Sequence, residues 1–403
     1  MEMHVPPANP DRYHRQRLLG FIGDVGQQRL GESRVVLVGC GALGCMMADQ
    51  LVRAGVGLLR IIDRDIVDLT NLQRQILFDE SDAREALPKA IAAARRLRQI
   101  NSQVRIEAEV ADFHAGNAEE IVWEGSGFRV QGSVEDDEAR SPNSEGMTND
   151  EAGGRGRATE RRSDGATEGA IENRKSKIEN APCLILDGTD NVETRYLIND
   201  LAVKYGIPWI YGACVGSEGR VMAIVPGRTA CLRCVFPQPP RPEELPTCDT
   251  AGVLAAAPAV VGAIQAAAAI RLLTGDATGA GRLLSFDLWT GRFWEISAAR
   301  RDDCPCCGRR RFEFLEVREP RAVSLCGRNA VQLRRVADPG GTGALVERLS
   351  RVGLVDERPY FIRFRPDTER DLMITSFPDG RVVVYGTSDA GRARSIVAKY
   401  YGS

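Results

Sequence analysis

The feature that most constrains this chain is a glycine-rich loop directly after a continuous apolar segment. Residues 34–38 read Arg-Val-Val-Leu-Val, which is typical of a strand buried on both faces of a sheet. The loop has the pattern G-x-G-x-x-G and opens a predicted helix over 42–53, as in nucleotide-binding β-loop-α units. Its glycines let the backbone approach a phosphate, and the helix N-terminus favours negative charge. We therefore expect the nucleotide to contact Gly39, Gly41, Ala42 and Gly44.

The alternation of apolar segments after this loop predicts an α/β fold with a doubly wound, mainly parallel, Rossmann-like sheet. A single helix over 12–30 is expected to precede it. The Ala-rich segment 253–273 is interpreted as a buried helix rather than a membrane span, because Gly, Pro and Gln interrupt it. The other expected strands are 58–62, 104–110, 184–186, 208–211, 219–225, 283–286 and 292–296, with a helix over 88–99.

Changes in composition predict two domains. Residues 125–180 are rich in Gly, Ser and charged residues, so we interpret them as a disordered insertion within a first domain, 1–314. Residues 315–403 are expected to form a small α+β domain. Its expected helices are 344–352 and 390–400, and its expected strands are 359–364, 372–377 and 381–385.

Polar residues that follow the predicted strands indicate which nucleotide binds. Asp63 ends the second strand, where a carboxylate can accept hydrogen bonds from ribose hydroxyls. Amide and cationic donors come next, and Asp190 follows a later strand, where it can hold Mg²⁺. This combination suits a triphosphate better than a nicotinamide, although an NAD-dependent oxidoreductase and a non-catalytic binding module stay open as alternatives. The further candidate residues are Asn71, Arg74, Gln75, Lys89 and Asn191.

Two C-x-x-C pairs about 70 residues apart predict a structural zinc site with four cysteine ligands. The pairs are Cys231 with Cys234 and Cys304 with Cys307, and Cys306 could compete with Cys307. The alternative is one redox-active pair beside unrelated thiols.

A further cysteine, Cys248, precedes the Ala-rich helix, where a lowered thiol pKa would make it a candidate nucleophile. A purely structural role is the alternative for this residue. The chain contains 11 cysteines, an odd number that disfavours a disulfide framework. Cys40, Cys45, Cys183 and Cys214 are interpreted as core thiols.

Charge and composition exclude some classes of partner. Lys and Arg number 53 against 55 Asp and Glu, so we expect neither nucleic acid nor an anionic membrane surface as a partner. Residues 1–20 are polar and do not resemble a secretory signal, which favours a cytoplasmic protein.

Taken in order along residues 10–310, these motifs resemble the E1-like adenylating enzymes of the ThiF, MoeB and HesA type. The resemblance rests on Arg12-Tyr-His-Arg-Gln16, the glycine loop, Asp63, residues 71–75, Lys89, Asp190-Asn191 and both C-x-x-C pairs. It implies attack by the C-terminal glycine carboxylate of a small ubiquitin-like sulfur carrier, ending in Gly-Gly, on the α-phosphate of ATP. The products are an acyl-adenylate and pyrophosphate, for sulfur transfer in thiamine or molybdopterin synthesis.

The same resemblance assigns roles to residues. It implies a homodimer in which Arg15 reaches the neighbouring subunit's ATP, and a cysteine desulfurase or another sulfur donor as a further partner. Cys248 aligns with the cysteine that forms a thioester or persulfide in some members. Arg74, Lys89 and Asp190 complete the implied catalytic set. A tRNA-modifying dehydratase of the same family is the alternative within it.

The C-terminal residues depart from the family's pattern. Multidomain relatives often end in a rhodanese domain with a persulfide-carrying loop cysteine. Here Cys326 lies in Ser-Leu-Cys-Gly-Arg-Asn, which is not the usual C-R-x-G-x-R loop, so we expect a structural cysteine and a domain of another fold.

Overall fold

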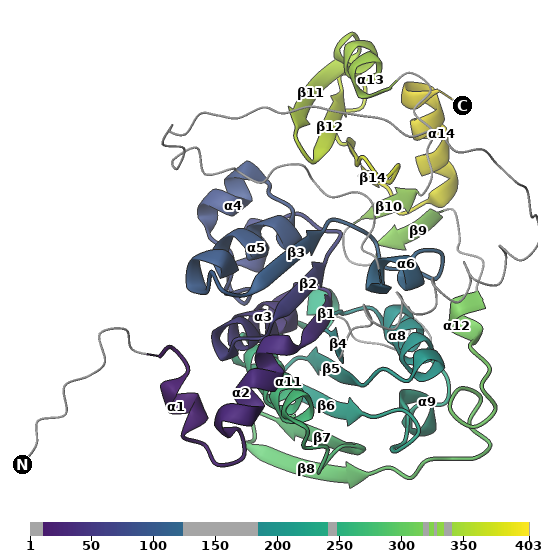
Figure 1. The fold of residues 1–403 in the computed structure, drawn as a ribbon. Helices are drawn as coiled ribbons and strands as arrows, with labels where there is room; N and C mark the ends of the chain where they lie inside the picture. The colour runs from purple at the N-terminus through teal and green to yellow at the C-terminus, as the bar shows by residue number, and fades with distance from the viewer. Residues whose placement is uncertain are drawn as a thin grey trace, which may run out of the picture.

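The computed structural model describes residues 11–123, 184–240, 248–316, 322–325, 329–333 and 341–402. The predicted insertion over 125–180 lies outside these ranges, as do Cys183 and Cys326. Two sheets organise the described residues: a larger one in the N-terminal three-quarters of the chain and a smaller one near the C-terminus (Figure 1).

The larger sheet has eight strands in the order β3-β2-β1-β4-β5-β6-β7-β8. Neighbours from β3 to β5 pair in parallel, and neighbours from β5 to β8 pair antiparallel. The strands are β1 (Arg34–Val38), β2 (Leu58–Ile62), β3 (Arg105–Glu109), β4 (Leu184–Asp187), β5 (Trp209–Val215), β6 (Glu218–Ile224), β7 (Arg282–Asp287) and β8 (Arg292–Ser297). This order confirms the mainly parallel α/β fold, with the parallel strands at the end that carries the glycine loop.

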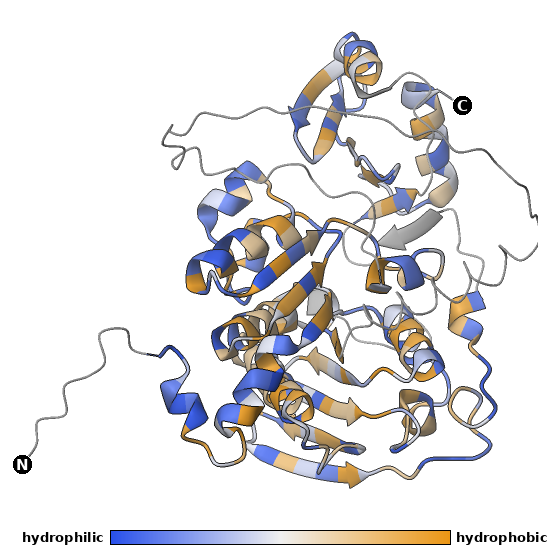
Figure 2. Cartoon of the chain, in the orientation of Figure 1, coloured by the Kyte–Doolittle hydropathy of each residue, from blue (hydrophilic) through white to orange (hydrophobic). Residues whose placement is uncertain are grey.

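Helices cover both faces of the larger sheet, which is the doubly wound arrangement (Figure 1). Successive residues of β1 point to opposite faces, so Val35 and Leu37 join one core cluster while Val36 and Val38 join the other. Figure 2 shows hydrophobic residues concentrated in these strands. The first cluster is covered by α2 (Gly23–Glu32), α3 (Ala42–Ala54), α5 (Lys89–Ile100) and α11 (Ala256–Thr274), and the second by α6 (Ala118–Trp123), α8 (Val192–Tyr205) and α9 (Leu232–Val235).

The N-terminal segment differs from the prediction of one helix over 12–30. It forms α1 (His14–Arg17) and α2, separated by a turn. Gly23 at the start of α2 has a φ of +56°, a left-handed conformation that a continuous right-handed helix does not contain. The apolar spacing that favoured one helix continues across the turn, which is why the pattern alone did not reveal the break.

Helix α11 is the only described helix that is long and apolar enough to cross a membrane. It packs against α3 and the sheet, where the core helix of a folded domain would lie (Figure 1). Gly262 allows the close approach, because a Cβ there would come within 2.7 Å of the Met46 Cβ. The buried Gln265 side chain donates to the Asp187 carbonyl, which ties α11 to β4.

The smaller sheet has six antiparallel strands in the order β11-β12-β13-β14-β10-β9. Its core contains Phe364, Ile374 and Val384, with apolar residues of the two helices that cover it. The sequence predicted three of these strands and both helices, but not β9, β10 or β11. The elements are β9 (Ala322–Leu325), β10 (Ala330–Leu333), α13 (Gly341–Ser350), β11 (Gly353–Arg358), β12 (Phe361–Pro366), β13 (Met373–Ser376), β14 (Val382–Tyr385) and α14 (Ala390–Tyr401).

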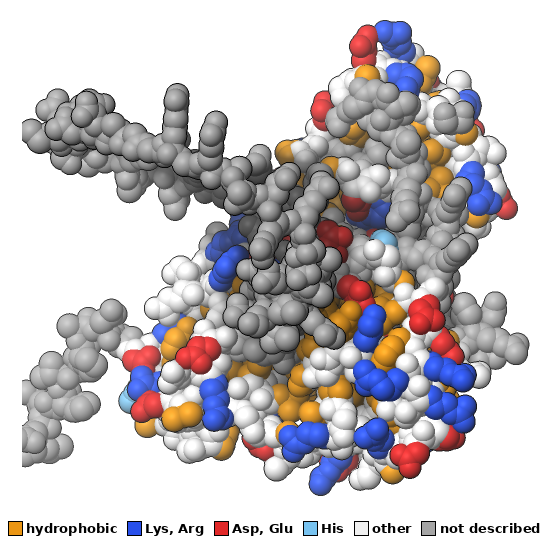
Figure 3. Space-filling view, turned by 45° about the vertical axis from the view of Figure 1, so that its right-hand side comes forward, with side chains coloured by type: hydrophobic (Ala, Val, Ile, Leu, Met, Phe, Trp, Pro, Cys, Tyr) orange, Lys and Arg blue, Asp and Glu red, His pale blue; other side chains and the backbone are white. Residues whose placement is uncertain are grey.

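Four short helices and a 3-10 turn complete the described structure. The helices are α4 (Glu80–Glu85), α10 (Cys248–Ala251), α12 (Glu313–Glu316) and the α1 already described, and the 3-10 turn is η1 (Leu69–Asn71). On the face shown in Figure 3, basic and acidic side chains are interspersed over the larger unit, with hydrophobic patches between them.

Candidate active site

The glycine loop lies at the carboxyl end of β1, beside the equivalent end of β4. Gly39 has a φ of +87°, and a Cβ there would lie 2.8 Å from the Gly188 carbonyl carbon. A Cβ on Gly44 would lie 2.1 Å from the Gly39 oxygen, so the start of α3 can approach the loop only without a side chain. Gly41 and Ala42 line the adjoining pocket, where the N-terminus of α3 favours an anion.

Asp63 follows β2 directly and is held by the backbone on both sides. One carboxylate oxygen accepts from the Cys40 N–H at 2.7 Å, and the other accepts from the Asp65 N–H at 2.8 Å. Burial raises the pKa of Asp63, while the nearby Lys89 cation and the two N–H donors act in the opposite direction. The carboxylate therefore has a fixed orientation at the pocket wall, as ribose recognition requires.

The donors predicted to hold phosphates come from the segment after β2 and the start of α5. Asn71 closes a capping box with Asp68, so the turn around η1 is rigid. The Lys89 N–H donates to the Asp65 carbonyl, which brings the buried Lys89 ammonium to 3.1 Å from the Asp65 carboxylate. Lys89 thus presents a buried cation at the pocket wall.

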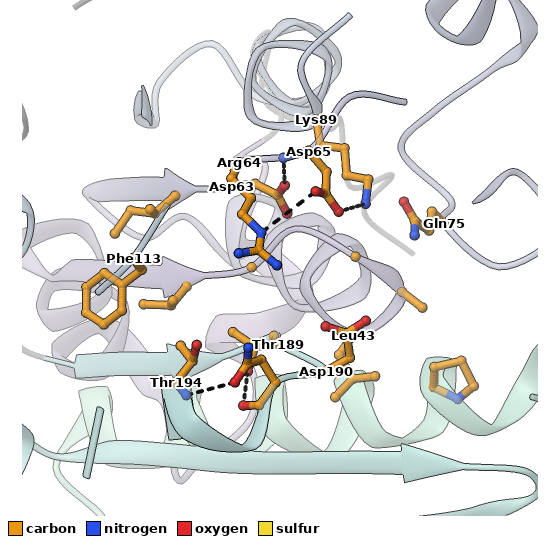
Figure 4. A pocket seen from close by; sticks show the side chains of 18 of the residues that line it. Leu43, Asp63, Arg64, Asp65, Gln75, Lys89, Phe113, Thr189, Asp190 and Thr194 are labelled. Atoms are coloured by element: carbon orange, nitrogen blue, oxygen red, sulfur yellow. Dashed lines mark hydrogen bonds and ion pairs between the residues drawn. The ribbon is translucent and has the colours of Figure 1, made fainter. Parts of the chain in front are cut away.

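Arg74 and Gln75 line the same pocket from this segment. The Arg74 guanidinium donates to the Thr70 carbonyl, and Gln75 is buried with a side-chain oxygen that has no hydrogen-bond partner among the described residues. Figure 4 shows Asp63, Asp65 and Lys89 on one side of the pocket and Thr189, Asp190 and Thr194 on the opposite side.

The loop after β4 supplies that opposite side. Asp190 is exposed and lines the pocket, whereas the Asn191 side chain caps α8 by accepting from the Thr194 N–H at 3.1 Å. Asp187, within β4, is fully buried and bonded to Thr189 and Arg195. Burial raises the pKa of Asp187, and the Arg195 guanidinium acts against that rise. Asp187 and Arg195 thus hold the loop that presents Asp190.

Several residues that line the pocket were not anticipated from the sequence, and three of them lie after β2 and β3. Arg64 and Phe113 line the pocket, and Asp112 pairs with Arg64 through an Nη1–Oδ1 distance of 2.9 Å. Arg64 follows Asp63 directly, so its position beside the predicted ribose ligand was a usable signal. Asp112 and Phe113 lie beyond β3 in a segment without a recognisable motif.

Four cysteine sulfurs come together in the second core cluster, on the face of the larger sheet that α6, α8 and α9 cover. The Sγ atoms of Cys231, Cys234, Cys304 and Cys307 all lie within 4.8 Å of one another, and all four residues are buried. Tetrahedral zinc–thiolate bonds separate sulfurs by about 3.8 Å. The observed separations of 3.3 Å for Cys234–Cys307, 3.6 Å for Cys231–Cys304 and 4.0 Å for Cys231–Cys234 bracket that value.

Cys306 lies outside this group of four. Its sulfur accepts a hydrogen bond from the Asn199 amide of α8 at 3.3 Å. The candidate ligand of the second pair is therefore Cys307, and the sequence alone did not distinguish the two.

Two predicted residues, Arg15 and Cys248, are not among the described residues that line the pocket. Arg15 is exposed on α1. Cys248 is the first residue of α10, and its side chain lies outside the described part of the structure. The prediction that Cys214 is a core thiol is wrong, because this residue is only half-buried and lines the pocket. Cys40 and Cys45 are buried core thiols, as predicted.

Comparison with known proteins identifies the family. A sequence model described as the ThiF family matches residues 13–125 and 159–306. The chain is also 39% identical over 400 residues to the sulfur carrier protein ThiS adenylyltransferase of Bacillus subtilis, covering 97% of this chain and 99% of that protein. The chain belongs to the ThiF family. These two matches confirm the family that the ordered motifs indicated.

Other similar proteins match about three-quarters of the chain. The sulfur carrier protein adenylyltransferase of Thermus thermophilus is 34% identical over 304 residues, covering 74% of this chain and 90% of that protein. Among solved structures, Escherichia coli MccB with ATP has a TM-score of 0.53 at 18% identity, covering 75% of this chain and 77% of that one. The latter likeness concerns the fold alone.

Proposed function

We propose that this protein adenylates the C-terminal glycine of a ubiquitin-like sulfur carrier, with ATP as the donor. The observation that carries the proposal is the convergence of the glycine loop, Asp63, Lys89 and Asp190 on one pocket at the carboxyl edge of the parallel strands. Such an edge is where open α/β sheets bind ligands. The names of the ThiF-family relatives give the same reaction class.

Each side of the pocket suits one part of ATP. Asp63 would accept from the ribose hydroxyls, and the glycine loop with the start of α3 would contact phosphate. Asn71, Arg74, Gln75 and Lys89 would hold the triphosphate, because an amide and cationic cluster neutralises its charge. Phosphate would compete with Asp65 for the Lys89 ammonium, whose present distance to that carboxylate is 3.1 Å.

The chemistry needs alignment rather than a general base. A carboxylate oxygen of the carrier's terminal glycine attacks the α-phosphorus of ATP, and the bond from that phosphorus to the bridging oxygen breaks. Pyrophosphate leaves with the electron pair, and the carrier is left as its acyl-adenylate. Because the nucleophile is already an anion, the protein's contribution is to orient both reactants and to offset their charge.

Two metal ions fit the residues present. Asp190 would bind Mg²⁺ through its exposed carboxylate, and the ion would neutralise phosphate charge. The four buried cysteines have the donor chemistry and spacing for a structural Zn²⁺ that joins α9 to the segment 304–307.

A homodimer would complete the site with Arg15 of the neighbouring subunit. In support, α1, α2 and the turn between them expose Leu18, Phe21 and Val25, each more than 60% accessible. Apolar side chains grouped in this way mark surfaces that bind another protein. Arg15 lies on the same segment, so association through it would bring the guanidinium toward a second subunit.

Several finer features belong to the same proposal. Residues 1–314 would form the adenylating domain and 315–403 a separate α+β domain, in a cytoplasmic protein. The Cys248 thiolate would attack the carbonyl carbon of the carrier's acyl-adenylate and form a thioester, with AMP as the leaving group. If a cysteine desulfurase or another persulfide donor has first transferred its outer sulfur to Cys248, the same attack by the Cys248 persulfide would form an acyl persulfide. A ThiS-like carrier for thiamine synthesis is favoured over a molybdopterin carrier by the Bacillus subtilis relative. Neither a tRNA-modifying dehydratase nor an NAD-dependent oxidoreductase is favoured by these relatives.

Pyrophosphate exchange tests the proposal. Purified protein with Mg²⁺, ATP and a carrier ending in Gly-Gly should incorporate labelled pyrophosphate into ATP. The matched control is the same carrier with its C-terminal carboxylate converted to an amide, which removes the nucleophile and should abolish exchange. Absence of exchange with ThiS-like and molybdopterin-type carriers alike would refute the proposed reaction.

A further inference from the structure

The smaller sheet contacts the wall of the nucleotide pocket through a buried side chain. Gln332 in β10 is 1% exposed, and its amide donates to the Asp112 carboxylate at 2.8 Å. The other oxygen of Asp112 accepts from the Arg64 guanidinium at 2.9 Å. A continuous chain of two hydrogen bonds therefore links the C-terminal sheet to a residue that lines the pocket.

A second contact fixes the backbone of the same residue. The Arg381 guanidinium donates to the Arg64 carbonyl at 3.1 Å. Arg381 is itself held, because it pairs with Asp379 at 3.0 Å and lies over the Phe377 ring at 4.1 Å from the centroid. The C-terminal unit thus restrains both the main chain and the side chain of Arg64.

Arg64 is placed to contact the nucleoside. It follows Asp63, the candidate ribose acid, and Figure 4 shows its guanidinium extending into the pocket on the side of Phe113. Its side chain is 28% exposed, so it is available to a ligand while Asp112 holds it. A guanidinium plane is a group that stacks on an aromatic base.

We propose that the C-terminal unit sets the affinity for ATP by holding Arg64 against the nucleoside end of the pocket, with Gln332 and Arg381 as positioning residues. The inference rests on the proposed function, which puts ATP in this pocket. An arginine side chain that is already ordered loses less conformational entropy when the ligand binds. Since Arg64 lies beside Asp63, the candidate ribose ligand, we expect it to contact ATP equally before and during the reaction. Its contribution should then appear in nucleotide affinity and leave kcat unchanged.

The test measures ATP affinity in the full-length protein by calorimetry without a carrier, and then KM and kcat in pyrophosphate exchange. Gln332→Ala and Arg381→Ala should each weaken ATP binding about three- to tenfold, the range expected for one lost hydrogen bond. The KM for the carrier and kcat should stay at their wild-type values. Lys399→Ala is the matched control, because its ion pair with Glu369 lies within the C-terminal unit, and it should bind ATP like wild type.

A double-mutant cycle separates positioning from a general loss of structure. Arg64→Ala should weaken ATP binding by a similar factor, and adding Gln332→Ala to it should have no further effect. The inference is overturned if Arg64→Ala binds ATP normally, if the two effects multiply, or if the variants change the carrier's KM instead. Because calorimetry needs no carrier, failure of the proposed reaction would show as wild-type protein that binds ATP without exchange.

Discussion

At the scale of single residues, the pocket depends on a buried cation beside two carboxylates. Lys89 is almost fully buried, and its ammonium lies 3.1 Å from the Asp65 carboxylate. Burial raises the pKa of Asp63, and the Lys89 cation acts against that rise. Without the ammonium, these carboxylates would repel a triphosphate. Under the proposed function, Lys89 would offset carboxylate charge in the empty pocket and phosphate charge in the occupied one.

Lys89→Ala should reduce pyrophosphate exchange by about a hundredfold, the usual loss when one charge-stabilising group is removed. Lys204→Ala is the control, because the Lys204 ammonium pairs with Glu119 on the surface and lies outside the pocket lining. Exchange in that variant should equal the wild-type rate. If Lys89→Ala keeps half of the wild-type exchange rate or more, the phosphate role of Lys89 is wrong.

Cys248→Ala should separate activation from transfer. The acyl-adenylate forms without a cysteine, so pyrophosphate exchange should continue at the wild-type rate in this variant. A conjugate with the carrier that thiols can reduce, or that hydroxylamine can cleave, should disappear on non-reducing gels. Cys214→Ala is the matched control, since Cys214 is a pocket thiol with no assigned role. A conjugate that persists in Cys248→Ala identifies another attachment residue.

Sequence reasoning found the pocket residues that follow strands in recognisable motifs, but not those defined by distant partners. Asp63 and Asp190 come after strands 58–62 and 184–187, so the topology alone brings them to one edge. The pairing of Arg64 with Asp112 depends on how the segments after β2 and β3 meet in three dimensions. The pairing of Arg195 with Asp187 depends on how α8 folds back against β4. Charged residues in loops are common, and their spacing carries no such information.

At the scale of elements, the cysteine group joins two segments that are far apart in the chain. Cys231 precedes α9, while Cys304 and Cys307 lie in turns after β8. The Cys231–Cys304 and Cys234–Cys307 contacts each join residues 73 positions apart in the sequence. A metal ion bound by both would close this long loop and restrain the antiparallel half of the larger sheet.

Cys304→Ser should lose bound zinc and unfold at a lower temperature, whereas Cys306→Ser should keep about one zinc per chain. Both residues are buried and lie two positions apart, so a difference between the two variants reports metal binding and not the loss of a buried thiol. Metal content by elemental analysis and thermal unfolding measure the two effects. A strong chelator should lower the unfolding temperature of wild type but not of Cys304→Ser. Equal zinc content in both variants would contradict the four-cysteine assignment.

Helices and strands were predicted well where one apolar spacing ran along the whole element. They were predicted poorly where a turn interrupted a segment whose apolar spacing did not change. The apolar run 34–38 and the glycine loop identified β1 and α3 almost to the residue. The α1–α2 break was missed because the apolar spacing continues across the Gly23 turn. Strand β11 was missed because its residues are half-buried or exposed, so its sequence lacks the alternation of a core strand.

At the scale of the whole molecule, the two sheets contribute unequally to the candidate site. The larger sheet supplies the side chains expected to contact ATP, and the smaller one reaches the pocket through Gln332 and Arg381. The relative from Bacillus subtilis matches over nearly the full length, whereas the one from Thermus thermophilus matches over 74% of this chain. A second subunit would add Arg15. The complete site would then require the larger sheet, the smaller sheet and the neighbouring subunit.

Mixing two inactive variants tests the contribution of Arg15 across a dimer. Arg15→Ala lacks the residue donated to the neighbour, and Lys89→Ala lacks its own phosphate cation, so each homodimer should be nearly inactive. In a mixed dimer, the Arg15→Ala subunit has an intact Lys89 and receives Arg15 from its partner, so one of its two sites is complete. Random exchange of subunits at equal amounts should then restore about a quarter of the wild-type exchange rate. A mixture that stays inactive although light scattering shows mixed dimers would mean that Arg15 does not act across the interface.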